Sequence, residues 1–423
     1  MRRFHAAFGA ALIAGAVLPA AARAAPAEAA PAPVIEPWVG DRAEADAYTR
    51  YELLDPASHK FHILYEITAT TPGAKLYFNP IRPGSVASDE HVYDRATGKE
   101  LKFSVVHADQ ARAEGLSDAD PHADYIRVEL ARPVPADGGQ GRILIEKTYE
   151  DAKSYHMDGG DIVFDRPLGI KRSAVVLPRG WELADANYPS QVIEQADGRI
   201  GIAFWNGTPA EAPLKLRARK IMSGAPASSS VDARALDERA HQNRDIVYFL
   251  NRPETNSFFL YHDYTESRPG VGVYVNVVRT GSHANGPAGK NLDTGAPLAV
   301  KILKGDEITA AHLPADEAPD KVTPDTEVVV FSFPPVMQGG SARLRMFETY
   351  TDPPSYHVDD KGELIFHRSF GRAADAVVLP DGWMLTNSSI PATVTTLGDG
   401  RVRLDFVNPR NDEIDVIITA RKR

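Results

Sequence analysis

The tripeptide Ser-Tyr-His occurs twice, and its histidines are the residues of this chain best suited to acid–base chemistry. In the first occurrence, His156 follows Tyr155 and is close to Asp158. An imidazole near a carboxylate can act as a general acid or base, and the guanidinium of Arg166 can hold an anionic substrate. The set predicts a hydrolase or lyase acting on a polysaccharide. Packing is the competing interpretation, because both copies of a duplication tend to keep their packing residues.

A second group of residues is suited to binding a ligand. Lys171 and Arg172 form a basic cluster, which in an acidic protein can bind an anionic sugar, a phosphate or a carboxylate. Trp205 and Asn206 end a predicted strand beside a polar turn, where an indole ring can stack on a sugar. Tyr155 belongs to this group as a further aromatic contact. A solvated loop and ordinary packing are the competing interpretations.

The only metal expectation is calcium, in an acidic loop. Asp118, Asp120 and Asp124 alternate in the sequence SDADPHAD, and oxygen-rich loops of this kind can hold calcium. The spacing lacks the glycine and the terminal glutamate of an EF-hand, so an ordinary solvated loop is the alternative. No other cofactor is expected.

Most of these residues lie in a stretch that the chain contains twice. Ser154–Asn206 matches Ser355–Asn408, and upstream Tyr51–Ser85 matches Tyr248–Ser282 without a gap. Two copies are too few for a solenoid, which needs three or more short repeats. Each copy is long enough to bury its own core. The sequence therefore predicts two tandem, homologous units.

Hydrophobic residues within each unit follow the period of a β-strand. Phe61, Ile63 and Ile67 alternate with polar side chains, which predicts a half-buried strand. Many more short strands follow, separated by Gly, Pro, Asn and Asp, and no long helical period is present. The fold class predicted is all-β, with two antiparallel, Ig-like β-sandwich units. Short helices are expected over Asp41–Arg50 and over Val231–Asn243, the second in the linker.

The domain boundaries follow from composition. Residues 1–24 are expected to be a signal peptide, with Arg2 and Arg3 before an apolar run and an A-x-A cleavage site. Residues 25–40 form an Ala/Pro-rich linker. The first sandwich unit spans 41–220, residues 221–237 hold a linker and the helix start, and the second unit spans 238–423.

Composition restricts the location and the partners. The net charge is −10, which gives no footprint for nucleic acid. The chain has no cysteine, so disulfides and thiolate chemistry are excluded. No segment after the predicted signal peptide is apolar for long enough to cross a bilayer. A periplasmic or secreted protein is expected.

Motifs of the common enzyme classes are missing: there is no H-E-x-x-H, no G-x-S-x-G and no Walker A sequence. The sequence therefore favours a protein without enzymatic activity that binds a cell-envelope glycan or a protein partner. A polysaccharide-active enzyme using His156, Asp158 and Arg166 is the first alternative. A structural envelope protein is the second, because sandwich folds host all three functions.

One resemblance to known proteins is carried by the turns. Val175–Trp181 reads VVLPRGW and precedes a D-G-R turn at Asp197, and Val377–Trp383 repeats the pattern. This order resembles exported β-sandwich modules that lie beside catalytic domains in some zinc aminopeptidases. The resemblance implies the fold only. The metal-binding helix of those enzymes has no counterpart in this sequence, so it implies no catalytic residue.

Overall fold

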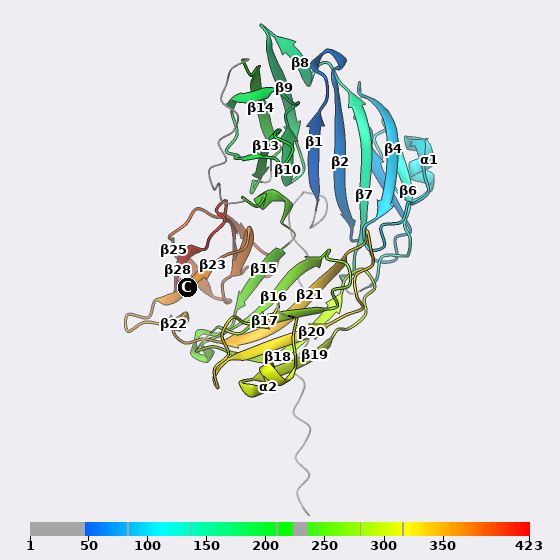
Figure 1. Ribbon diagram of the computed structural model, residues 1–423. Helices are drawn as coiled ribbons and strands as arrows, with labels where there is room; N and C mark the ends of the chain where they lie inside the picture. Colours follow the sequence, from blue (N-terminus) through cyan, green and yellow to red (C-terminus); the bar gives the residue numbers. More distant parts are fainter. Residues whose placement is uncertain are drawn as a thin grey trace, which may run out of the picture. The chain divides into compact units, whose positions relative to one another are not determined.

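The computed structural model describes residues 47–222 and 236–423, apart from positions 83, 137, 209, 243, 280, 315 and 316. The predicted signal peptide and the 25–40 linker lie outside these residues. The helical segments described are α1 (Ala108–Ala113), α2 (Asp306–Ala310) and the 3-10 turns η1 (Pro56–Ser58), η2 (Arg239–His241) and η3 (Pro253–Thr255). Strands make up nearly all other regular structure, so the predicted all-β fold is confirmed (Figure 1). None of the helices described is long and apolar enough to span a membrane.

The first half of the described chain forms three sheets. The largest has seven strands in the order β12 (Gln191–Glu194), β13 (Ile200–Trp205), β10 (Arg172–Val176), β1 (Tyr48–Leu53), β2 (Lys60–Ala69), β7 (Gly141–Glu150), β4 (Val86–Asp94). A four-stranded sheet has the order β11 (Trp181–Ala186), β14 (Ala212–Lys220), β9 (Asp161–Leu168), β8 (Tyr155–Asp158). A three-stranded sheet has the order β3 (Leu76–Pro80), β6 (Asp124–Glu129), β5 (Phe103–His107).

The second half repeats this arrangement strand for strand. Its seven-stranded sheet has the order β26 (Thr393–Thr396), β27 (Val402–Val407), β24 (Ala374–Val378), β15 (Arg244–Leu250), β16 (Ser257–Glu266), β21 (Ala342–Thr351), β18 (His283–Asn291). The four-stranded sheet is β25 (Trp383–Ser388), β28 (Ile414–Lys422), β23 (Leu364–Phe370), β22 (Tyr356–Val358), and the three-stranded sheet is β17 (Val273–Val277), β20 (Glu327–Ser332), β19 (Ala299–Lys304). Because strand order and chain order match in both halves, the units are homologous, as predicted.

Each half contains two sandwiches that share one long sheet. In the first half, one face of the seven-stranded sheet packs Phe61 and Val175 against Phe164 of the four-stranded sheet. Further along the same sheet, Ile67 and Ile143 belong to a separate buried cluster with β6 of the three-stranded sheet. The long sheet is thus covered by two smaller sheets, and a junction exists where one cover ends and the other begins.

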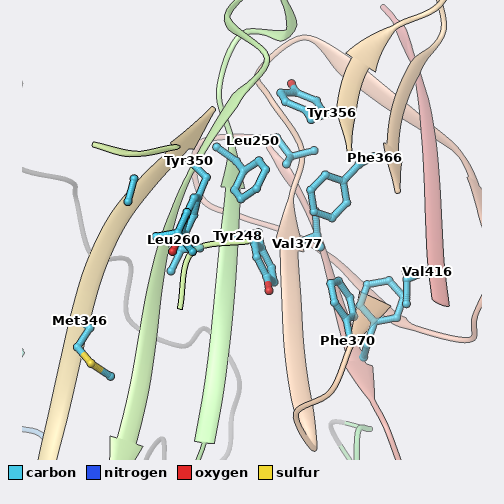
Figure 2. Packing of buried hydrophobic residues seen from close by; sticks show 14 of the residues in the cluster. Tyr248, Leu250, Leu260, Met346, Tyr350, Tyr356, Phe366, Phe370, Val377 and Val416 are labelled. Carbon is cyan, nitrogen blue, oxygen red and sulfur yellow. The ribbon is translucent and has the colours of Figure 1, made fainter. Parts of the chain in front are cut away.

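The second half has one continuous core over the corresponding face. Tyr248, on β15, lies in the middle of it and packs its ring parallel to that of Phe370, with centroids 5.5 Å apart. Figure 2 shows these rings together with Leu260 and Met346 from the long sheet and Phe366 from β23. The buried side chains of the long sheet therefore continue past the edge of the four-stranded cover, toward the junction.

The structure corrects two predictions of helix and limits the prediction of antiparallel strands. Of the helix predicted over Asp41–Arg50, residues 41–46 lie outside the described part, and Tyr48–Arg50 belong to strand β1. Tyr51 and Leu53 of this strand are buried with the period of a strand, and pairing on both sides outweighs local helix propensity. In the linker, the described residues from 236 onward form only the 3-10 turn η2, whose Ala240 carbonyl accepts a hydrogen bond from Arg172. The sheets are antiparallel except that β1 pairs with β10, and β15 with β24, in parallel.

Candidate functional site

A cavity of about 230 Å³ lies in the second half at the junction of the three sheets. The long sheet contributes residues from β15, β16, β21 and β24. The three-stranded sheet contributes Asn276 and Phe331, and β23 with the turn that follows it contributes Arg368 and Arg372. The wall facing Phe331 includes Leu260 and Met346 of the long sheet, so part of the cavity surface is apolar.

Strand register brings polar side chains onto the wall formed by the long sheet. Ile246 on β15 pairs with His262 on one side and with Asp375 on the other. Cross-strand neighbours project from the same face of a sheet, so these three side chains form one row. In the next row, Leu260 pairs with Glu348. The interior face of the sheet thus carries an imidazole and two carboxyl groups at the cavity.

Glu348 is 2% exposed and only partly satisfied. Its Oε2 accepts hydrogen bonds from Asn276 Nδ2 at 2.6 Å and from the Tyr350 hydroxyl at 2.7 Å. Its Oε1 is buried and has no hydrogen-bond partner among the described residues. Burial raises the pKa of this carboxyl above its ordinary value, more than the two hydrogen bonds lower it. Glu348 therefore holds a proton more readily than an exposed glutamate.

His262 and Asp375 are buried to a similar degree, with 5% and 4% exposed. Burial lowers the pKa of His262 well below its ordinary value, and Arg244 and Arg372 lower it further. The imidazole is therefore neutral at neutral pH. Burial raises the pKa of Asp375 well above its ordinary value, against the opposing charge of Arg372. In the described part of the chain, His262 Nε2 and Asp375 Oδ1 have no hydrogen-bond partner.

Arg368 on β23 and Arg372 in the turn after that strand have different surroundings. Arg368 Nη1 lies 3.0 Å from Asp352 Oδ2, and its guanidinium lies over the rings of Tyr248 and Phe258. It is held in place by an ion pair and by packing. Arg372 has a buried Nε without a hydrogen-bond partner in the described residues, although it lines the same cavity.

The cavity lining therefore combines an apolar surface with four polar residues, each of which has a buried atom without a hydrogen-bond partner among the described residues. The four residues are His262, Glu348, Arg372 and Asp375. Buried polar atoms in folded proteins nearly always have a partner, and several exceptions in one cavity call for an explanation. The set offers N–H donors, carboxyl groups and an imidazole, which suits a small polar ligand or ordered water.

The first half has a different set of residues at the same place. The pairing of Ile63 with Lys147 corresponds to that of Leu260 with Glu348, so a lysine replaces the glutamate. Lys147 Nζ donates a 2.6 Å hydrogen bond to Asn79 Oδ1. Burial, with a smaller contribution from Arg166, lowers the pKa of Lys147 to about 7. The two halves thus use the same buried position for groups of opposite charge type.

The residues predicted as catalytic have separate contacts in the structure. Arg166 is buried, with Nη1 3.0 Å from Asp151 Oδ2, and its guanidinium packs against aromatic rings. Asp158 forms an ion pair with Arg217 at 2.9 Å. His156 lies on β8 with a buried Nδ1 that has no partner in the described residues. Arg166 is thus committed to a buried ion pair, and a catalytic role for the three residues stays a prediction.

The residues predicted to bind a ligand are partly brought together. Lys171 Nζ and the Arg172 guanidinium lie 5.5 and 5.6 Å from the ring centroid of Trp205. Arg172, however, is buried and donates to backbone carbonyls, and the buried Asn206 side chain bonds to its own turn. The buried Tyr155 hydroxyl donates to a backbone carbonyl. Binding by Trp205 and Lys171, both half-buried, stays a prediction.

The acidic loop shows local contacts. Asp124 Oδ1 lies 2.9 Å from His107 Nδ1, and Asp120 Oδ1 accepts a hydrogen bond from the backbone N–H of His122. Asp118 is exposed. Among the residues described, no group of three or more His, Asp or Glu side chains is placed to hold a metal ion. Calcium binding by Asp118, Asp120 and Asp124 stays a prediction.

The sequence analysis missed the cavity residues, although a usable pattern was present. When the two halves are aligned, Glu348 is equivalent to Lys147, and Asp375 is equivalent to Ser173. A buried strand position that holds a basic residue in one copy and an acidic residue in the other is not conserved for packing. The repeat was used to find what the copies share, whereas the candidate site lies where they differ.

Comparison with known proteins gives only distant likenesses. No family model matches the chain, and no curated protein matches it. A solved aminopeptidase N family protein from Idiomarina loihiensis is similar over 41% of this chain and 29% of that protein, with 13% identity and a TM-score of 0.25. The collagen adhesin of S. aureus is similar over 77% of this chain and 88% of that chain, with 8% identity and a TM-score of 0.16. At these scores neither likeness carries an argument about function.

Proposed function

We propose that the protein is an exported, periplasmic or secreted binding protein whose second half takes up a small polar ligand, a sugar residue of a cell-envelope glycan. The observation that carries the proposal is that His262, Glu348, Arg372 and Asp375, each with an unpartnered buried side-chain atom, line one cavity. Leaving such atoms unpaired costs about 1–3 kcal/mol each, so a ligand that pairs them is favoured.

The size of the cavity supports a small ligand. Its volume of about 230 Å³ is below the ~300–1,000 Å³ of pockets that enclose drug-sized molecules. A single sugar ring, or the end of a longer chain, matches that scale better than a peptide segment. The glycan is therefore preferred over a protein partner for this site.

The chemistry of the walls supports a sugar. A sugar ring has an apolar face of C–H groups and a rim of hydroxyl groups that both donate and accept hydrogen bonds. Leu260, Phe331 and Met346 offer an apolar surface, while Glu348 and Asp375 offer carboxyl groups at other points. Binding sites for small molecules typically combine an apolar lining with a few placed polar groups.

The test is a binding titration of the whole protein with monosaccharides and short envelope oligosaccharides, followed by calorimetry and thermal unfolding. A sugar at a hundredfold excess over its dissociation constant should stabilise the protein by roughly 3 kcal/mol. Asp375→Asn and Glu348→Gln should weaken that sugar at least tenfold. Asp109→Asn, which changes a carboxylate that is 85% exposed, is the matched control and should bind like the wild type. Equal binding by Asp375→Asn, Glu348→Gln and the control would reject the site.

A second function, a polysaccharide-active enzyme, is favoured by one observation. Glu348, whose carboxyl pKa is raised by burial, and His262, whose imidazole is neutral, line the same cavity, and a general acid and a general base need shifts in these directions. Product release from oligosaccharides, lost in Glu348→Gln while binding persists, would support it. Activity lost instead in His156→Ala would favour the residues of the first half.

A further inference from the structure

We propose that the sugar bound in the cavity is an acidic one, whose carboxylate is held by Arg372 with help from Arg279. This inference rests on the proposed function, because it names the chemical class of the ligand at the same site.

The cationic side of the cavity is only partly neutralised. Arg368 has Asp352 as its ion-pair partner at 3.0 Å. Arg279 also lines the cavity, and its guanidinium bonds to the hydroxyl of Ser369. Across the described residues, neither Arg279 nor Arg372 forms an ion pair. Two guanidinium groups are therefore available to an anion at this site, and guanidinium groups bind carboxylates in a planar, often bidentate geometry.

The two buried carboxyl groups of the cavity oppose an anion less than exposed carboxylates would. Burial raises the pKa of both Glu348 and Asp375, so each of these carboxyl groups holds a proton more readily than an exposed one. A protonated carboxyl donates a hydrogen bond to an anion instead of repelling it. Glu413 is the remaining carboxylate on the cavity lining, and it is exposed. The interior of the site therefore favours a negatively charged group.

The first half shows that the fold does not need this arginine. Both halves have a glycine directly after the strand, Gly169 and Gly371, and each glycine lies against a glutamate. The next residue is Ile170 in the first half and Arg372 in the second. The corresponding turns thus form with either side chain. Since an isoleucine suffices for the turn, the turn does not require the guanidinium of Arg372, which can therefore serve an anion in the cavity.

The experiment compares acidic sugars with their neutral parents on the full protein. Glucuronic and galacturonic acid are titrated by calorimetry against glucose and galactose at the same ionic strength. The acid should bind at least tenfold more tightly than the parent. Arg372→Gln should lower the affinity for the acid at least tenfold and that for the neutral sugar by much less, so that the preference for the acid is lost, while Arg372→Lys should retain part of the preference. Arg179→Gln, which changes a side chain that is 70% exposed, is the control.

The outcomes separate this inference from the proposed function. If neutral sugars bind as well as the acids, or if Arg372→Gln keeps the preference, the acidic ligand is rejected while sugar binding stands. If none of the four sugars binds, the inference is rejected, and the larger envelope oligosaccharides then decide the proposed function. A circular dichroism spectrum and an unfolding midpoint close to those of the wild type show that each variant is folded.

Discussion

Replacing Lys147 by methionine should remove a pH dependence of stability that begins near neutral pH. The side chain is 3% exposed, and its amine lies on the interior face of the long sheet beside Asn79. Burial lowers the pKa of Lys147 from the ordinary 10.5 to about 7. Methionine has a similar length and no charge, so the variant tests the cost of keeping an amine at this position.

The magnitude follows from proton linkage. In the unfolded chain Lys147 binds its proton below about pH 10.5, whereas in the folded chain it does so only below about pH 7. Between these values the unfolded state holds the extra proton, so stability rises with pH, by about 1.4 kcal/mol for each pH unit. The penalty is about 4 kcal/mol at pH 7.5 and about 1.4 kcal/mol at pH 9.5. The wild type should thus gain between 2 and 3 kcal/mol, roughly, relative to the variant.

The assay is urea unfolding of both proteins at pH 7.5 and pH 9.5. The variant leaves the side-chain oxygen of Asn79 without its N–H donor on Lys147, which costs about 1–3 kcal/mol. Because that cost does not change with pH, the difference between the two proteins is the quantity to measure. Lys102→Met, at an exposed position, is the control, and its free energy of unfolding should change between the two pH values as much as that of the wild type. If the free energy of unfolding of Lys147→Met changes between pH 7.5 and pH 9.5 as much as that of the wild type, the amine is not buried as the structure has it.

Three further predictions concern buried groups elsewhere. Arg166→Ala should lower the free energy of unfolding by about 3–5 kcal/mol, because it leaves the carboxylate of Asp151 buried without its ion-pair partner; removing both side chains should recover part of the loss in urea titrations. Tyr155→Phe should lower it by about 1 kcal/mol through the lost hydrogen bond to the Leu54 carbonyl, as seen in the urea midpoint. Asp375→Asn should raise it by about 1–3 kcal/mol at pH 7, and by less at pH 5. A carboxyl whose pKa is raised by folding loses stability as pH rises, and an amide does not titrate, so an equal effect at both pH values would contradict the account.

The fold could be predicted to a large extent because its evidence is local and is present twice. Alternation at Phe61, Ile63 and Ile67 predicts a strand with one buried side, and these side chains are buried. The parallel pairing of β1 with β10 has no such local pattern, since partners in a parallel pair lie far apart in the sequence. The helix predicted over Asp41–Arg50 is wrong at Tyr48–Arg50, which begin strand β1, because the pairing of this strand on both sides is a tertiary effect.

The candidate site could not be predicted from the sequence, for a physical reason. A polar residue in a strand is normally assigned to the solvent side. Around His262, with Tyr261 and Tyr264 nearby, apolar and polar residues do not alternate regularly, so the sequence does not show which side His262 faces. Its direction is fixed by the register with Ile246, and its environment by the neighbouring sheets. The ends of the two covering sheets determine which buried positions face a cavity, and that boundary is set by packing between distant segments.

The most direct test of the central claim is a crystal structure of the protein grown with glucuronic acid. The account predicts the sugar in the cavity of the second half, with its carboxylate on Arg372 and its hydroxyl groups within hydrogen-bond distance of Asp375 and Glu348. Ordered water that satisfies these atoms, with the sugar absent from the cavity or bound at another surface, would contradict it.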